Sequence, residues 1–377
     1  MSSLSKFFTS RWGPMITGTA VGVLAPLLVK LGNPGNMGIC VACFTRDIAG
    51  AVGLQRVATV EYIRPEIIGL VLGALVAALV FREFKPRAGS APLVRFLLGI
   101  FAMIGALVFL GCPWRAWLRL SAGDWNAIAG IVGLAAGVGV GIVFLRMGFS
   151  LGRNRPTASA AGWVMPAMMV ALLALLFIAP QFGRDASGAL TGPIFFSATG
   201  PGSQHAPVLI ALAAALVIGF LAQRSRFCTI GGLRDVMLLR DTYLFSGIVA
   251  LVLVAFATNL ALGQFNPGFD KEPIAHTDAI WNFGGMVLAG LAFTLAGGCP
   301  GRQLILSGEG DTDAAVFWLG MLVGAGFAHI FNLASAAAGP SPYGPAAVIV
   351  GLVVCGAIGF VMRERIAQVV FGAAMGE

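Results

Sequence analysis

The sequence predicts an all-α polytopic membrane protein with about ten transmembrane helices, re-entrant half-helices and an inverted internal repeat. The first observation is composition, because 58% of the 377 residues are hydrophobic and only 11% are charged. Soluble domains carry about 25% charged residues, so a soluble globular fold is excluded. The second observation is a series of apolar runs of roughly membrane-spanning length, and the third is a pair of cysteine motifs that each occur twice.

The apolar runs recur along the whole chain, and each has about the twenty residues that cross a bilayer core of about 30 Å. A membrane β-barrel would instead show short segments of alternating hydrophobicity. The predicted spans lie near 12–30, 61–82, 91–110, 125–146, 162–180, 205–223, 243–263, 280–297, 314–335 and 345–361.

Four segments between these spans are too brief to cross the bilayer, yet they hold the cysteine motifs. They are residues 36–56, 111–124, 226–240 and 298–312. Irregular backbone at membrane depth is tolerated only where protein or a water-filled cavity satisfies its polar groups. We therefore expect these segments to re-enter as half-helices that meet near the middle of the protein.

The cysteine motifs indicate an internal duplication. Gly111-Cys112-Pro113-Trp114-Arg115 is echoed by Gly298-Cys299-Pro300-Gly301-Arg302, an offset of 299 − 112 = 187. Cys40 followed by Arg46-Asp47 is echoed by Cys228 followed by Arg234-Asp235, an offset of 228 − 40 = 188. Two motifs with nearly one offset favour a duplicated half, as found in transporters.

The repeat is expected to be inverted, because five crossings separate its two copies and an odd number reverses the unit. We predict one membrane domain, residues 1–377, in which the halves 1–147 and 205–336 are related by a pseudo-two-fold axis in the membrane plane. Residues 148–204 would form the inverting linker span, and residues 337–377 the final span and tail.

The distribution of basic residues predicts the orientation. Of the 24 Lys and Arg residues, 16 fall on one side of the predicted spans and eight on the other. Cytoplasmic loops carry the excess of positive charge, which also explains the net charge of +8 without nucleic acid. We expect a multi-pass protein of the bacterial inner membrane with a retained first span and both termini in the cytoplasm. Cys40 and Cys112 would then enter from outside, and Cys228 and Cys299 from the cytoplasm.

The half-helices predict an anionic ligand, because a helix N-terminus presents free N–H groups and a positive dipole end. Thiols are weak donors and polarizable acceptors, which match a soft sulfur or selenium atom better than sulfate or phosphate. The alternative is that the cysteines are small apolar fillers, which is our interpretation of Cys355 in the last span. The candidate substrate-path residues are Cys40, Cys43, Cys112, Cys228 and Cys299.

The charged residues of the motifs have two open interpretations, since ionisable groups at membrane depth should be paired or face water. They either attract an anion or form structural ion pairs. These residues are Arg46, Asp47, Arg115, Arg234, Asp235 and Arg302. Asp124 and Asp311, which precede apolar runs, are typical of helix N-caps.

Other chemistry is disfavoured by the sequence. Cys40-Val-Ala-Cys43 spells a C-x-x-C motif, but the redox motif occurs in a βαβ context and a zinc site needs further ligands at matched spacing. The three histidines are scattered, and no ATP-binding or nucleophile motif is found. We expect no enzyme activity, no catalytic residue, no cofactor and no metal.

The repeated G-C-P-x-R segments and C-x5-R-D pairs resemble the YeeE/YedE family of sulfur-transport membrane proteins, and most closely its YedE branch, described as selenium transporters. The resemblance implies an hourglass-like bundle and central cysteines that pass an anion along through S–H contacts. It implies a permease for a small selenium- or sulfur-containing anion and a cytoplasmic partner of the TusA or YedF sulfurtransferase type. The alternatives are a thiosulfate transporter of the same fold, or a membrane-bound redox or sulfurtransferase protein that uses Cys40 and Cys43.

Overall fold

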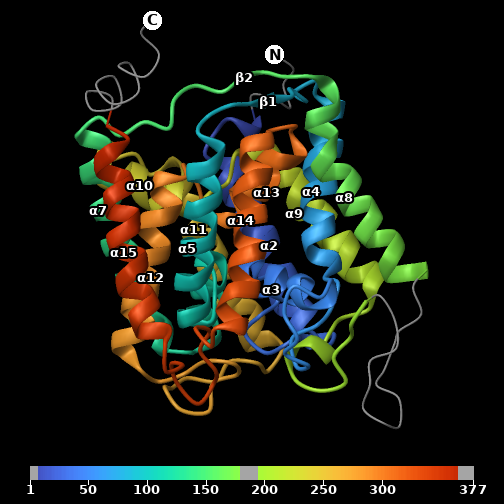
Figure 1. The fold of residues 1–377 in the computed structure, drawn as a ribbon. Helices are drawn as coiled ribbons and strands as arrows, with labels where there is room; N and C mark the ends of the chain where they lie inside the picture. The colour runs from blue at the N-terminus through green and yellow to red at the C-terminus, as the bar shows by residue number, and fades with distance from the viewer. Residues whose placement is uncertain (1–6, 179–193, 364–377) are drawn as a thin grey trace, which may run out of the picture.

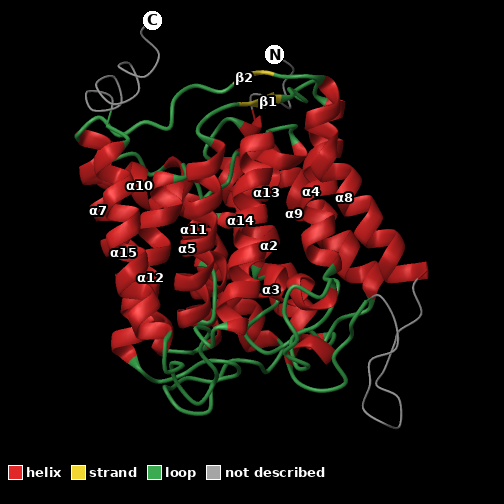
Figure 2. Cartoon of the chain, in the orientation of Figure 1, coloured by secondary structure: helices red, strands yellow, loops and turns green. Residues whose placement is uncertain are grey.

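The computed structural model describes residues 7–178 and 194–363, and these form a bundle of long helices with short helices inside it (Figure 1). Figure 2 shows how fully helix dominates the described chain. The long helices are α2 (Trp12–Lys30), α4 (Pro65–Val80), α5 (Pro92–Phe109), α7 (Asn126–Arg146), α8 (Ser159–Ile178), α9 (Val208–Ser225), α11 (Tyr243–Ala261), α12 (Ala279–Leu295), α14 (Thr312–Ile330) and α15 (Gly344–Val361). The short helices are α3 (Val41–Ala51), α6 (Pro113–Ala122), α10 (Thr229–Leu239) and α13 (Pro300–Gly308), with a 3-10 turn at Pro201–Ser203.

The predicted membrane fold is confirmed. Nine helical stretches of the described residues are long and apolar enough to cross a membrane, and three of them join a long helix to the half-helix that follows it. The remaining predicted span is α4, whose 16 residues are also apolar. At 1.5 Å per residue it is about 24 Å long.

Several predicted boundaries differ by a few residues, and the span expected near 314–335 ends at Ile330. The span expected near 61–82 begins as a helix only at Pro65, because proline is favoured at the first helical position and holds the preceding residue extended. Arg64 accordingly has φ −80° and ψ 109°. The span expected near 162–180 begins earlier, at Ser159, and its last two predicted residues lie outside the described part of the chain.

A small β-ribbon adds to the predicted all-α fold. β1 (Arg87–Ala88) pairs antiparallel with β2 (Arg155–Pro156). The ribbon joins the loop after α4 to the loop after α7 at one end of the bundle (Figure 1).

Helix packing repeats between the two parts of the chain. α4 packs on α9 as α11 packs on α2, and α14 packs on α5 as α7 packs on α12. The half-helices follow the same rule, since α13 contacts α4 and α6 contacts α11. If α2 to α7 are matched in order with α9 to α14, every one of these contacts maps onto its counterpart, as expected of two equivalent halves.

Glycines allow close approach in these helix contacts. A Cβ atom at Gly137 of α7 would lie 2.2 Å from the carbonyl oxygen of Val287 in α12. In the corresponding pair, a Cβ atom at Gly320 of α14 would lie 2.2 Å from the carbonyl oxygen of Phe96 in α5. Small residues let membrane helices approach in this way.

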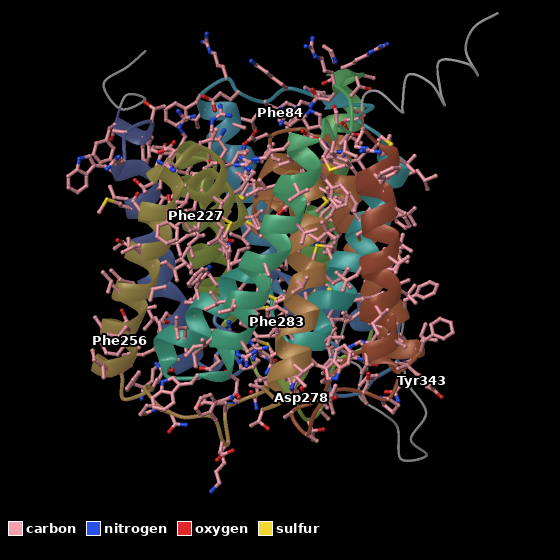
Figure 3. All side chains as sticks on the ribbon, turned by 90° about the vertical axis from the view of Figure 1, so that its left-hand side faces the viewer. Phe84, Phe227, Phe256, Asp278, Phe283 and Tyr343 are labelled. Carbon is pink, nitrogen blue, oxygen red and sulfur yellow. The ribbon has the colours of Figure 1, made fainter. Side chains whose placement is uncertain are left out.

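The half-helices lie toward opposite ends of the bundle. Phe84 marks one end, and Asp278 and Tyr343 mark the other (Figure 3). α10 and α13 lie toward the Phe84 end, where α2 begins and α15 ends, whereas α3 lies toward the other end (Figure 1). α6 also belongs to that other end, because Asp124 just after it bridges to Gly268 in the loop after α11.

Candidate functional site

Each half-helix begins directly after one of the predicted cysteines. Cys40, Cys112, Cys228 and Cys299 are the N-cap residues of α3, α6, α10 and α13, and all four have extended backbone. In three of them the sulfur accepts a backbone N–H from the residue three positions on, at 3.2 to 3.4 Å. The thiols therefore lie at the positive ends of the half-helix dipoles.

The four N-cap cysteines form two pairs. In the first pair, the Sγ atoms of Cys40 and Cys112 are 3.8 Å apart. In the second pair, the backbone N–H of Cys299 donates to Sγ of Cys228 at 3.4 Å. All four residues are at most 5% exposed, so both pairs are closed to solvent in this conformation.

The half-helices of the two pairs meet at their N-terminal ends. Trp114, the second residue of α6, packs beside Phe227, with 5.8 Å between ring centroids. A Cβ atom at Gly301, the second residue of α13, would lie 2.6 Å from Cζ2 of Trp114. Trp114 and Gly301 hold the same place in the repeated motif, so the indole fills the space that the glycine leaves. This contact brings the first and second pairs toward one central region.

Cys43 differs from the other predicted cysteines in its position. It lies inside α3 rather than at its N-cap, and it is fully buried. Its sulfur contacts Nη1 of Arg115 at 3.5 Å. Cys40, not Cys43, is therefore the positional counterpart of Cys228.

Arg115 is a buried cation whose contacts in the described structure are all with neutral groups. Besides the Cys43 thiol, its guanidinium donates to four backbone carbonyl oxygens, at distances that include 2.9 Å from Nε to Asn36 and 3.1 Å from Nη2 to Ile274. The others belong to Leu110 and Pro273. Arg115 thus ties the first pair to two loops. Its positive charge lies beside the first pair, and in the described structure no carboxylate contacts it.

Asp47 receives two guanidinium groups. Arg46 Nη2 and Arg64 Nε each lie 2.7 Å from an oxygen of Asp47, and the side chains are at most 4% exposed. This cluster joins α3 to the start of α4 and favours the structural interpretation of the predicted ion pair. The sequence analysis did not select Arg64 as a site residue. The available signal was its position, because Arg64 is a charged residue directly before Pro65, where an apolar run begins.

The corresponding charges of the other half are less buried. Arg234 pairs with Asp235 at 2.8 Å, with side chains 31% and 16% exposed. Arg302 pairs with Glu309 at 3.2 Å.

The two predicted helix caps differ in outcome. Asp311 caps α14, because its carboxylate accepts the backbone N–H of Ala314. The N-cap of α7 is Trp125 rather than Asp124, although Asp124 still accepts a backbone N–H, that of Asn126.

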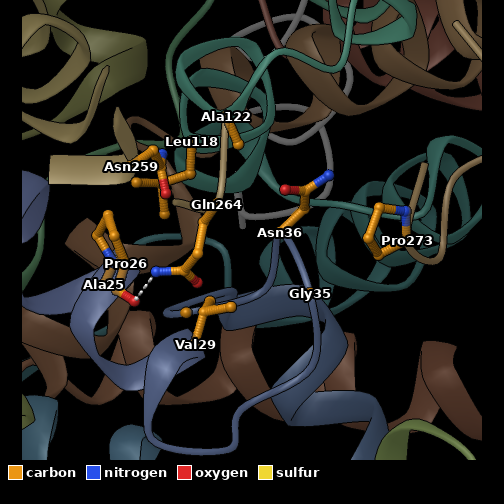
Figure 4. Close-up of a pocket in the computed structure, with 11 residues that line it drawn as sticks. Ala25, Pro26, Val29, Gly35, Asn36, Leu118, Ala122, Asn259, Gln264 and Pro273 are labelled. Atoms are coloured by element: carbon orange, nitrogen blue, oxygen red, sulfur yellow. Dashed lines mark hydrogen bonds between the residues drawn. The ribbon is translucent and has the colours of Figure 1, made fainter. Parts of the chain in front are cut away.

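A cavity of about 230 Å³ lies near the first pair, between α2, α6 and α11 (Figure 4). It is lined by Asn36, Leu118, Asn259 and Gln264 among others, and Gln264 Nε2 donates to the carbonyl oxygen of Pro26 at 3.2 Å. Because Arg115 holds the carbonyl of Asn36, the cavity wall is tied to the buried cation of the first pair.

A second cavity, of about 320 Å³, lies near the second pair and is mainly basic. Burial would raise the pKa of Glu83 at its edge, but hydrogen bonds from Gln223 and Arg224 lower that pKa, so the carboxylate stays ionised. The charged residues that line the cavity are Lys85, Arg87, Arg226 and Arg302, with Glu83 and Glu309.

The fold and the site define a multi-pass membrane protein in which half-helices bring thiols and helix N-termini to a common centre. The profile of the sulphur transport family matches residues 224–368. The family resemblance that the repeated motifs predicted is thereby confirmed for this part of the chain, which is similar to the sulfur-transport proteins of the YeeE/YedE family.

Two curated proteins are similar to parts of the chain. The thiosulfate transporter TsuA of Spirochaeta thermophila is 34% identical over 108 residues, which cover 26% of this chain and 31% of that protein. The fluoride-specific ion channel FluC 2 of a Synechococcus species is 39% identical over 85 residues, which cover 22% of this chain and 61% of that protein. The chain thus spans less than two thirds of either relative.

Proposed function

We propose that this protein is an inner-membrane permease that passes a small sulfur- or selenium-containing anion between the first and second cysteine pairs. The observation that carries the proposal is the placement of four cysteines at the N-caps of four half-helices. The half-helices approach one another from opposite ends of the bundle, so the two pairs provide successive stations along one route.

The chemistry of the stations suits such an anion. Half-helix N-termini attract negative charge, and a thiol can donate weakly to a soft terminal sulfur or selenium atom. Arg115 adds a positive charge beside the first pair, where its contacts are neutral. Because the sulfur atoms are buried, passage requires the half-helices to separate briefly. A passive relay suffices if a cytosolic enzyme consumes the anion.

Thiosulfate is the first substrate to test, because the relative TsuA is named a thiosulfate transporter. A selenium-containing anion is the second candidate and rests on the motif resemblance. A membrane-bound redox or sulfurtransferase function of Cys40 and Cys43 is the alternative from another class.

We also propose the topology that the basic residues predict. The end that holds α10 and α13 would face the cytoplasm together with both termini, and residues 1–147 and 205–336 would be the inverted halves joined by 148–204. A sulfurtransferase-like partner of the TusA or YedF type would receive the anion at this end, where the basic cavity lies.

Uptake into liposomes of the purified protein tests the transport proposal. We expect labelled thiosulfate or selenosulfate to enter, sulfate to be rejected, and Cys112→Ala, Cys228→Ala and Cys299→Ala each to reduce uptake. Cys355→Ala is the matched control, since Cys355 is equally buried but lies on α15. Equal loss in the control, or equal entry of all anions, would contradict the proposal. If the protein instead shows a redox or sulfurtransferase activity that only Cys40→Ala and Cys43→Ala abolish, the redox alternative is correct.

A further inference from the structure

We propose that Trp114 and Thr229 supply the hydrogen-bond donors of a central anion site between the two cysteine pairs. This inference rests on the proposed function and names the place where the anion pauses. The ligand class is a small oxyanion with a soft terminal sulfur or selenium atom, of the thiosulfate type.

Both donors are buried, and neither meets a strong acceptor in the described structure. Trp114 and Thr229 are 0% exposed, and Nε1 of the indole has no hydrogen-bond partner among the described residues. The Thr229 hydroxyl has no nitrogen or oxygen partner among them and lies beside the Cys299 thiol, which is a weak acceptor. Burying a polar group without a hydrogen bond is costly, and the great majority of buried polar groups are satisfied. A ligand that supplies acceptor oxygens would satisfy both groups.

The two donors lie where three half-helix N-termini converge. Thr229 is the first residue of α10, directly after Cys228, and it lies near Cys299. Trp114 is the second residue of α6, directly after Pro113. The Cε2 and Cζ2 atoms that adjoin its N–H face the start of α13, 2.7 and 2.6 Å from the Cβ position of Gly301. An anion held there would also meet the positive dipole ends of these helices.

The repeat indicates that the architecture does not require these donors. The counterpart of Trp114 is Gly301, and at an offset of 188 the counterpart of Thr229 is Val41. Neither counterpart side chain carries a donor, although the same half-helix is formed in each case. The central site is therefore asymmetric, with its indole N–H from one half and its hydroxyl from the other.

The site would bind thiosulfate more tightly than sulfate, because the two ends of thiosulfate meet different protein groups. Oxygen atoms accept the N–H and O–H, while the terminal sulfur lies against the thiols, which are soft and polarizable. Sulfate offers four equivalent oxygens and leaves the thiols poorly matched. The hydroxyl and the indole N–H thus bind the oxygen atoms of the anion, and the cysteine thiols contact its terminal sulfur or selenium atom.

The test uses conservative variants of the full chain in liposomes. Thr229→Val removes the hydroxyl while keeping the shape, and Thr229→Ser restores it. Trp114→Phe removes the N–H and keeps an aromatic ring. The matched control is Trp117→Phe, because Trp117 lies one turn further along α6 and also carries a buried, unpartnered N–H. Thiosulfate uptake gives KM and maximal rate, and the thiosulfate-induced rise in melting temperature reports binding without transport.

We expect Thr229→Val and Trp114→Phe each to raise KM about tenfold or more, as for a lost hydrogen bond to a charged group. Each should reduce the thiosulfate-induced rise in melting temperature, whereas Thr229→Ser and Trp117→Phe should behave like the wild type. Unchanged KM in Thr229→Val and Trp114→Phe, or an equal change in Trp117→Phe, would overturn the inference while leaving transport intact. A wild type that neither transports nor binds sulfur anions would overturn the proposed function itself.

Discussion

Replacement of Asp47 by Asn probes the buried charge cluster that joins α3 to α4. The variant keeps the shape of the side chain but removes the only carboxylate that contacts Arg46 and Arg64, each at 2.7 Å, within the described structure. Both guanidinium groups then remain buried without their anion. Removing one partner of a buried ion pair costs about 3–5 kcal/mol, so we expect a loss of that size in the free energy of unfolding. Denaturant titration of the protein in mixed micelles measures it.

The matched control is Asp235→Asn, which changes the same motif position in the other half. The Arg234–Asp235 pair has nearly the same length, 2.8 Å, but its arginine side chain is 31% exposed. Exposed ion pairs contribute about 0–1 kcal/mol. We expect Asp235→Asn to lose less than about 1 kcal/mol. Equal losses in the two variants would refute the argument that burial, rather than the motif, sets the cost.

Three further predictions concern packing and pH. Gly137→Ala places a Cβ atom 2.2 Å from the backbone of α12 and should lower the melting temperature and the free energy of unfolding, the latter by at least about 1–3 kcal/mol, whereas Gly139→Ala, with nothing within 4 Å, should be neutral or stabilising. Gly301→Ala should likewise destabilise by about 1–3 kcal/mol, because its Cβ would lie 2.6 Å from Trp114, and it should cost less when it is introduced into a Trp114→Ala background. Burial lowers the pKa of His276, whose Nε2–H donates to the carbonyl oxygen of Val108 at 2.8 Å. The unfolded chain then binds the proton more readily, so its contribution to stability is present above about pH 6.5 and lost as the pH falls below that value. Denaturant titrations at about pH 7.5 and about pH 5.5 should therefore differ less in His276→Gln than in the wild type.

The helices were predictable because hydrophobic length and local stop signals decide them. The break before α6 follows from Gly111 and Pro113, and its N-cap is the predicted cysteine. The start of α4 was misplaced by a few residues, because residues 61–64 are all buried although they precede the helix. Hydropathy alone does not separate a buried loop from a helix end.

The candidate site was predictable in its residue types but not in its contacts. The motif offset places Cys40 opposite Cys228 without excluding Cys43, and only the N-cap geometry distinguishes the two. Arg115 offers a cation in the sequence, but its partners are backbone carbonyls of two loops, which no residue pattern specifies. The sequence did offer one indication of Trp114 and Thr229, because each differs in residue type from its counterpart in the other motif copy.

An anomalous difference map at the selenium edge, from crystals grown with selenosulfate, tests the cysteine-lined central path most directly. Selenosulfate replaces the terminal sulfur of thiosulfate with selenium and so marks the soft end of the ligand. We expect a peak in contact with the sulfur atoms of the first or second pair, on the side of Trp114 and Thr229. A peak confined to the surface cavities, or one that is unchanged when Cys112 and Cys299 are both replaced by Ala, would contradict it.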